Sequence, residues 1–121
     1  MIKGLRTAIY PVKDLAAAKA WYTDVFGTTP YFDQPFHVGF NIGGFELGLQ
    51  PDGQPGKTGT LVYWGVDDIE AEVGRITALG AEIHSAIQDV GDGIKVAELA
   101  DPFGNVLGLI HNPHFDPAAV R

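Results

Sequence analysis

Glu46 is the residue whose type and position in this sequence point most directly to acid–base chemistry. It lies in FELGLQ, residues 45–50, and strand alternation puts it on the same face as Gly48. If this face borders a cavity, loss of hydration raises the pKa of the carboxyl toward the range that a general acid or base needs. The alternative is a position near a strand end, where the side chain meets water. Glu98, in KVAEL, has no landmark that fixes its face.

Four histidines could bind a metal ion or transfer a proton, since imidazole is a ligand for several transition metals. His111 and His114 flank an Asn-Pro pair beyond the last predicted strand, so a loop is expected and their spacing predicts no metal site. His84 lies in AEIHSAI, and His37 lies in PFHVGF, where either face of a strand could border a ligand. The chain has no cysteine, which excludes a thiolate nucleophile and a sulfur-ligated metal.

The composition predicts one acidic domain. With 121 residues, 45% of them hydrophobic, the chain can bury one core but not two. Fifteen acidic and eight basic side chains give a net charge of -7, and the basic residues are scattered, so nucleic acid binding is not expected. No apolar run approaches the length of a membrane span, and the start of the chain lacks the pattern of a signal peptide. Membrane association is therefore not expected, and the predicted location is the cytoplasm.

The first half of the chain predicts a strand, a helix and two further strands. Residues 5–12 suit a strand, and Asp14 is a helix N-cap candidate. Apolar residues then recur at helical spacing until Gly27, which is a natural helix stop. Strands are expected around residues 36–42 and 45–50, separated by a Gly-Gly turn.

The second half repeats this pattern. The Pro/Gly-rich segment PDGQPGKTG predicts a connection, after which LVYWGV predicts a strand and Asp68 a second N-cap. A helix ending near Gly80 and strands near AEIHSAI, IKVAEL and VLGLI follow. We therefore predict a single domain over residues 1–121, with module 1 at about 1–51, a linker at 52–59, module 2 at about 60–113 and a tail at 114–121. Neither module is large enough to bury its own apolar face, so the two must pack together within one chain or between two.

Gly48 and Gly108 occupy matching places in the two halves, in ELGL and VLGL. The flanking leucines of each strand share one face, which we expect to receive the helices. Each glycine then lies on the opposite face, where a missing side chain leaves room. The pattern predicts a cavity between the two glycine-bearing faces.

The duplicated arrangement, with VKDLAAAKAWYTDVFG in the first half and VDDIEA, ALGAEI and DPFGNVLGL in the second, resembles the vicinal oxygen chelate superfamily. This group includes glyoxalase I, bleomycin-resistance proteins and extradiol dioxygenases. The resemblance covers about residues 3–112. It implies an α+β fold of two tandem βαβββ modules, whose curved mixed sheets surround a cavity, and a homodimer.

The resemblance also indicates where a metal would bind. Metal-dependent members carry a His or Gln in the first strand of a module, seven residues before the helix-capping Asp, and a Glu in its last strand. The matching positions here are Thr7 and Gly48 in module 1, and Leu61 and Gly108 in module 2. Glycine and leucine side chains offer no ligand atom, and a lone hydroxyl is a weak one. No metal and no cofactor are therefore expected.

Aromatic residues give the stronger binding signal. Tyr63 has the same strand parity as Leu61, and Phe36 the same parity as Phe40. Walls of aromatic and apolar groups with few polar ones are typical of pockets for small organic molecules. No nucleophile–base pair, phosphate-binding loop or G-x-S-x-G turn is present. The predicted ligand-binding residues are Thr7, Phe36, Phe40, Glu46, Gly48, Leu61, Tyr63 and Gly108, with Glu46 as the candidate catalytic group.

Three functions fit these features. The preferred one is a metal-free, dimeric member of the superfamily that binds an apolar or aromatic organic molecule, comparable in role to the drug-sequestering resistance proteins. The second is a lyase, isomerase or dioxygenase that uses displaced metal ligands or Glu46 as a base. The third is an accessory domain that binds a protein partner, whose sign would be a large exposed apolar patch.

Overall fold

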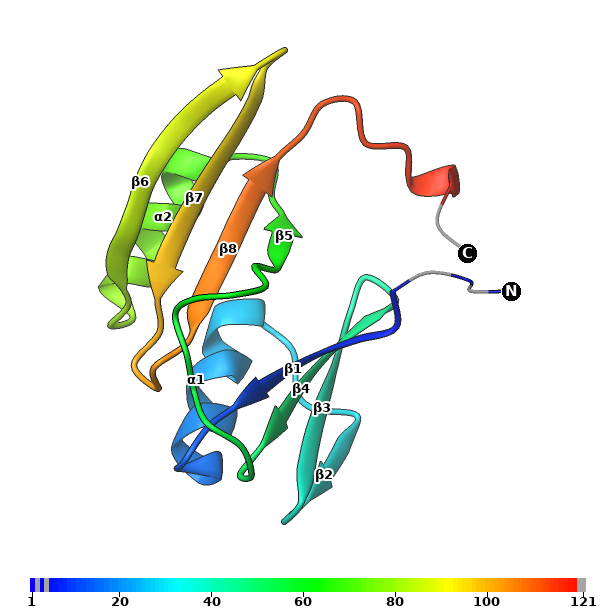
Figure 1. Ribbon diagram of the computed structural model, residues 1–121, viewed down its shortest axis with the longest axis vertical. Helices are drawn as coiled ribbons and strands as arrows, with labels where there is room; N and C mark the ends of the chain where they lie inside the picture. Colours follow the sequence, from blue (N-terminus) through cyan, green and yellow to red (C-terminus); the bar gives the residue numbers. More distant parts are fainter. Residues whose placement is uncertain (2, 4, 120–121) are drawn as a thin grey trace.

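Two four-stranded sheets, each with one helix, make up the computed structural model of the chain (Figure 1). The structure describes residues 1, 3 and 5–119. The order strand, helix, three strands occurs twice, which confirms the predicted α+β fold of two βαβββ modules. The predicted boundaries of the domain and its modules stay a prediction, and positions 2, 4, 120 and 121 within them lie outside the described residues.

Module 1 forms a mixed sheet, sheet A, in the order β1-β4-β3-β2. β1 runs parallel to β4, while β4, β3 and β2 are antiparallel to their neighbours. Its elements are β1 (Thr7–Pro11), α1 (Leu15–Phe26), β2 (Phe32–Gln34), β3 (His37–Ile42) and β4 (Phe45–Gln50).

Module 2 forms sheet B with the same topology, in the order β5-β8-β7-β6. The parallel pair is β5 and β8, and a long β6–β7 hairpin forms the far edge. Its elements are β5 (Tyr63–Gly65), α2 (Ile69–Ala78), β6 (Glu82–Gly91), β7 (Ile94–Ala100) and β8 (Val106–His111), followed by a short 3-10 turn, η1 (Pro117–Ala119).

Both helices begin at the aspartates that the sequence indicates. The carboxylate of Asp14 accepts a hydrogen bond from the backbone N–H of Ala17, and Asp68 accepts one from Ala71, each at 3.0 Å. These bonds satisfy N–H groups that have no partner inside the helix. Gly27 ends α1 in the left-handed conformation, at φ 67°, which costs glycine nothing.

One core joins the two modules within the chain. The leucine-bearing faces of β4 and β8 are buried, as predicted, together with Phe40 and Tyr22. The indole N–H of Trp64 in sheet B donates a hydrogen bond to the hydroxyl of Tyr10 in sheet A at 3.2 Å. The modules therefore pack against each other through their helix-bearing sides.

A buried carboxylate fixes the junction between the modules. Asp101, 6% exposed, accepts a hydrogen bond from the hydroxyl of Tyr22 on α1 at 2.5 Å. Its other oxygen accepts from the backbone N–H groups of Phe103 and Asn105, at 2.9 and 2.8 Å. The side-chain amide of Asn105 donates to the carbonyl oxygen of Pro11 at 2.7 Å. The loop before β8 is thus tied to both α1 and β1.

The remaining face of each sheet, which we call the open face, carries exposed apolar side chains. On sheet A Ile9 is 42% and Phe32 38% exposed, and beside sheet B Leu61 is 39% and Tyr63 37% exposed. Exposed apolar groups that gather on one surface are typical of a binding site. Among the described residues, no helix is long and apolar enough to cross a membrane.

Candidate functional site

Two rows of side chains cross the open face of sheet A. Thr7, Glu46 and Asn41 lie opposite one another on β1, β4 and β3 and form the first row. In the second row, Ile9 lies opposite Gly48, Gly48 opposite Gly39, and Gly39 opposite Phe32. Directly paired residues share a face, so both rows point away from the buried leucines.

Glu46 is held by three donors from three different segments. Its Oε1 accepts a hydrogen bond from the hydroxyl of Thr7 at 2.5 Å. Its Oε2 accepts one from the hydroxyl of Tyr31 and one from Nε2 of His37, the latter at 3.2 Å. The side chain of Glu46 retains 18% of its exposure, so a molecule on this face can reach it. Glu46 is the second residue of β4, near the strand end, and its side chain lies on the open face with most of its surface shielded from water.

The hydrogen bonds decide the ionisation of Glu46. Burial raises the pKa of this carboxyl, but the bonds from Thr7, Tyr31 and His37 outweigh burial and hold the pKa below its usual value. The sequence predicted a raised pKa, and that prediction is wrong because it counted desolvation without the donors. A carboxylate with a lowered pKa is fully ionised near pH 7 and is a weaker base. The same hydrogen bond raises the pKa of Tyr31, whose phenol therefore stays protonated.

This lowered pKa makes a prediction for stability. A group whose pKa is depressed on folding stabilises the protein above its unfolded-state pKa, here 4.5, and loses that contribution as pH falls through the lower folded value. Glu46→Gln should therefore lower the free energy of unfolding at pH 7 by about 1 kcal/mol. Urea unfolding should show this difference shrinking as the pH falls below 4.5. A difference that is independent of pH would contradict the assignment.

His37 connects Glu46 to Gln50. The side-chain nitrogen of Gln50 lies 3.0 Å from Nδ1 of His37, while Nε2 of the same ring faces Glu46. If the Gln50 amide donates to Nδ1, the ring proton lies on Nε2 and is donated to the carboxylate. Gln50 thus orients the imidazole, and the imidazole orients Glu46.

Neighbouring side chains fill the space above the glycines of this face, so the predicted open volume there is wrong. A β-carbon at Gly48 would lie 2.8 Å from both Cε1 of His37 and Cδ1 of Ile9. At Gly39 it would collide with the carboxylate of Glu46 and the ring of Tyr31. The missing side chains make room for the network that holds Glu46, which folds over the sheet at these points.

A different contact explains why a glycine is needed at Gly108 in sheet B. Its backbone N–H donates to the carbonyl oxygen of Val62 at 3.2 Å, and a β-carbon would collide with that same carbonyl. The position would also lie 2.9 Å from Cδ1 of Tyr63. Close approach of the chain entering β5 therefore requires this glycine, because another backbone leaves no room for a side chain.

The structure places the predicted aromatic ligand residues in different surroundings, some buried and some exposed. Phe40 is fully buried among the core residues, so its predicted place on the ligand surface is wrong. Phe36 precedes β3 and is 63% exposed, and its ring centre lies 5.9 Å from that of Phe32. Tyr31, 64% exposed, was not predicted. It lies in the loop before β2, where no alternation pattern exists to reveal it.

Sheet B carries a second, smaller polar group on its open face. Glu98 and Tyr63 both lie opposite Gly108, on β7 and β5, so the three residues share that face. The Tyr63 hydroxyl donates to Oε2 of Glu98 at 3.4 Å, and Nε2 of His84 lies 3.9 Å from Oε1. Partial burial, followed by the nearby Glu98, raises the pKa of Tyr63. Val96 and Ile110 lie beside this pair on the same face, together with Ser85 and Gln88.

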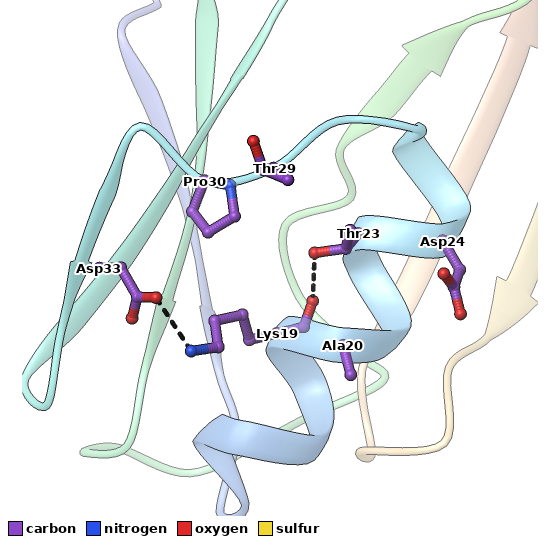
Figure 2. Close-up of a pocket in the computed structure, with 7 residues that line it drawn as sticks. All are labelled: Lys19, Ala20, Thr23, Asp24, Thr29, Pro30 and Asp33. Carbon is purple, nitrogen blue, oxygen red and sulfur yellow. Dashed lines mark hydrogen bonds and ion pairs between the residues drawn. The ribbon is translucent and has the colours of Figure 1, made fainter.

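Two depressions mark the surface of module 1. One, of about 190 Å³, lies beside Glu46 and is lined by Arg6, Tyr31, Asn41, Gly44, Phe45 and Glu46. The other, of about 500 Å³, lies between α1 and β2 (Figure 2). There Lys19 pairs with Asp33 at 2.9 Å, and the hydroxyl of Thr23 donates to the backbone of Lys19. The charged pair of this depression is exposed, whereas Glu46 is fixed by three donors, so Glu46 marks the stronger site.

The metal positions that the resemblance assigns do not fit a metal ion. Thr7 gives its hydroxyl to Glu46, Leu61 has no ligand atom, and β-carbons at Gly48 and Gly108 would already collide with neighbours. Across the described ranges, no three His, Asp or Glu side chains converge as a metal site requires. The residues present are therefore unsuited to the metal of that family.

Comparison with known proteins identifies the fold. The family model of the Glyoxalase/Bleomycin resistance protein/Dioxygenase superfamily matches residues 4–109. A protein named "Putative glyoxylase CFP32", from Mycobacterium bovis and from Mycobacterium tuberculosis, is 28% identical over an alignment of 107 residues, with 79% of this chain covered. The chain spans 41% of the length of these curated relatives.

Solved structures show the same architecture at low sequence identity. Lactoylglutathione lyase from Agrobacterium tumefaciens superposes with a TM-score of 0.75 and 21% identity, covering 94% of this chain and 98% of that one. TioX from Micromonospora sp. ML1 gives a TM-score of 0.72 and 22% identity, covering 89% and 98%. At these identities the likeness establishes the fold alone.

Proposed function

The chain belongs to the glyoxalase/bleomycin resistance protein/dioxygenase superfamily, and from that membership we propose that it is a metal-free member that binds a small organic molecule on the open face of sheet A. The observation that carries this proposal is the anchored Glu46, accessible and bordered by the exposed side chains of Ile9, Tyr31 and Phe32. A few fixed polar groups among apolar and aromatic ones are what such ligands need for orientation and affinity.

A second copy of the chain supplies the opposite wall in this proposal. Within one chain the two modules meet through their helix-bearing sides, so both open faces point outward. The open face of sheet A carries Glu46 and its donors, while that of sheet B carries Tyr63, Val96 and Ile110 beside Glu98. Pairing sheet A of one copy with sheet B of another forms two equivalent sites by a twofold axis and leaves neither face exposed. The expected product is a homodimer.

Binding without turnover is the form of this function that the site favours. Sequestration needs complementarity to a ligand and no group tuned to a transition state. The rival, an enzyme with Glu46 as general base, requires a carboxylate that accepts a proton readily, whereas three donors make this one a weaker base. TioX and lactoylglutathione lyase share the fold, so the scaffold does not choose between the two roles. The cytoplasmic location stays a prediction.

A blocking substitution tests the site. Ile9 is 42% exposed on the open face, so Ile9→Trp adds bulk there without entering the core. N-phenyl-1-naphthylamine, a neutral dye that fluoresces in apolar surroundings, should bind the wild type and bind this variant about tenfold more weakly. Val90→Trp is the matched control, because Val90 is 57% exposed on the β6–β7 hairpin. Equal loss in both variants, or no loss in either, would place binding elsewhere.

The oligomeric state tests the proposal that a second copy of the chain supplies the opposite wall of the site. Sedimentation equilibrium should give a mass of about 26 kDa, twice the 13.0 kDa of one chain. Tyr63→Glu adds a charge to the open face of sheet B and should shift the protein toward the monomer. A wild-type monomer at high micromolar concentration would contradict the dimer and would favour the third function, an accessory domain that exposes these faces to a protein partner.

A further inference from the structure

We propose that the group recognised at Glu46 is an organic cation, a protonated amine with apolar substituents, and this rests on the proposed function of ligand binding. The sequence predicted only an apolar or aromatic ligand. The structure adds an ionised carboxylate beside exposed aromatic rings. A carboxylate binds the N–H groups of an ammonium, and the ring faces attract its positive charge.

The donors around Glu46 fix its position and leave its charge in place. A carboxylate has about four lone-pair directions, and three are used by the hydroxyls of Thr7 and Tyr31 and the imidazole of His37. The two hydroxyl donors, Thr7 and Tyr31, carry no charge and therefore fix the carboxylate without neutralising it. One acceptor direction therefore remains, with the negative charge of the group behind it.

The aromatic neighbours are placed to receive the rest of the ligand. Tyr31 bonds Glu46 directly and is 64% exposed. The ring centre of Phe32 lies 5.7 Å from that of His37, which contacts the same carboxylate oxygen. Phe36 extends this group, at 5.9 Å from Phe32. A cation that reaches Glu46 thus lies beside aromatic rings, the combination that recognises alkylated and arylated ammonium groups.

Arg6 is the group that could favour an anionic ligand, because it lines the same depression as Glu46. Its NH1 donates to the carbonyl oxygen of Leu5 at 3.2 Å. The carboxylate of Glu46 extends over Gly39 in the second row of the face and is fixed through three contacts. This fixed placement favours the carboxylate as the recognition group, and the net charge of -7 favours cations over anions at long range.

Three probes of one shape test this inference: 2-phenylethylamine, protonated at pH 7, neutral 2-phenylethanol, and anionic phenylacetate. Calorimetry with the wild-type protein should give the amine a Kd about tenfold below that of the alcohol, with phenylacetate weakest. Raising the salt concentration to about 0.5 M should reduce the advantage of the amine several-fold, because the carboxylate is partly exposed. In Glu46→Gln the amine and the alcohol should bind about equally. Glu70→Gln, a change on the exposed side of α2 and away from both open faces, should keep the preference.

The outcomes separate this inference from the function on which it rests. If the alcohol binds as tightly as the amine, or if Glu46→Gln keeps the preference, the cation inference is overturned while ligand binding stands. Preference for phenylacetate would identify Arg6 as the recognition group and also overturn it. If no probe binds at millimolar concentration, and the dye test above also fails, the proposed function falls together with the inference. Circular dichroism of Glu46→Gln checks that the variant is folded. The salt series on the wild type tests the cation inference without the variant.

Discussion

Replacing Asp101 with alanine should lower the free energy of unfolding by about 3 to 5 kcal/mol, an effect expected only of groups buried at the centre of a network. The carboxylate is 6% exposed and satisfies the Tyr22 hydroxyl and the N–H groups of Phe103 and Asn105. Alanine would leave these three donors buried without an acceptor. Equilibrium unfolding in urea, monitored by tryptophan fluorescence, measures the loss.

Tyr22→Phe is the control for this prediction, because it removes a single donor and leaves the carboxylate with its two backbone partners. Its cost should be about 1 kcal/mol. If Asp101→Ala costs no more than Tyr22→Phe, the loop before β8 does not depend on the carboxylate. The junction also sets the relative placement of the two sheets, so Asp101→Ala should weaken dye binding even where the protein remains folded.

Gly108→Ala should destabilise the protein by about 3 kcal/mol, because the added methyl group meets the backbone of the chain entering β5. The carbonyl of Val62 is held by a hydrogen bond to Gly108 itself and cannot withdraw without breaking it. Backbone atoms also yield less readily than the end of a side chain. Thermal unfolding should show a midpoint lowered by roughly 10 °C or more.

Gly65→Ala is the matched control on the neighbouring strand. Gly65 lies opposite Ile110, two residues beyond Gly108 on β8, and a β-carbon there meets nothing within 4 Å. Its effect should stay within about 0.5 kcal/mol. Equal effects at the two glycines would mean that strand propensity, and not the approach of Val62, explains Gly108.

The sequence predicted the fold well because the fold depends on patterns that repeat. Helix caps at Asp14 and Asp68, alternating leucines in the last strand of each module and a Pro/Gly-rich connection all recur at fixed places. Each is a local signal with a local physical cause. Their duplication also indicated that the two halves pack together, since half of this chain cannot form a core alone, while the paired βαβββ modules were implied by the family resemblance.

The site was predicted in part, because its details depend on how side chains fold over the sheet. Strand parity placed Glu46 on the open face but could not show that Tyr31 and His37 reach its carboxylate. The face of Phe40 depended on a strand boundary, and the ring proved to be buried. The glycines were read as empty space, whereas neighbours from other segments fill it. Such neighbours come from distant parts of the sequence, so no periodic pattern in the sequence reveals them.

The most direct test of the central claim is to map 2-phenylethylamine binding by nuclear magnetic resonance on isotopically labelled wild-type protein. Ligand on the open face of sheet A, against sheet B of a second copy, should shift the amide resonances of Ile9, His37 and Gly48, and also those of Tyr63 and Gly108. Shifts confined to the depression between α1 and β2, around Lys19 and Asp33, would contradict the account.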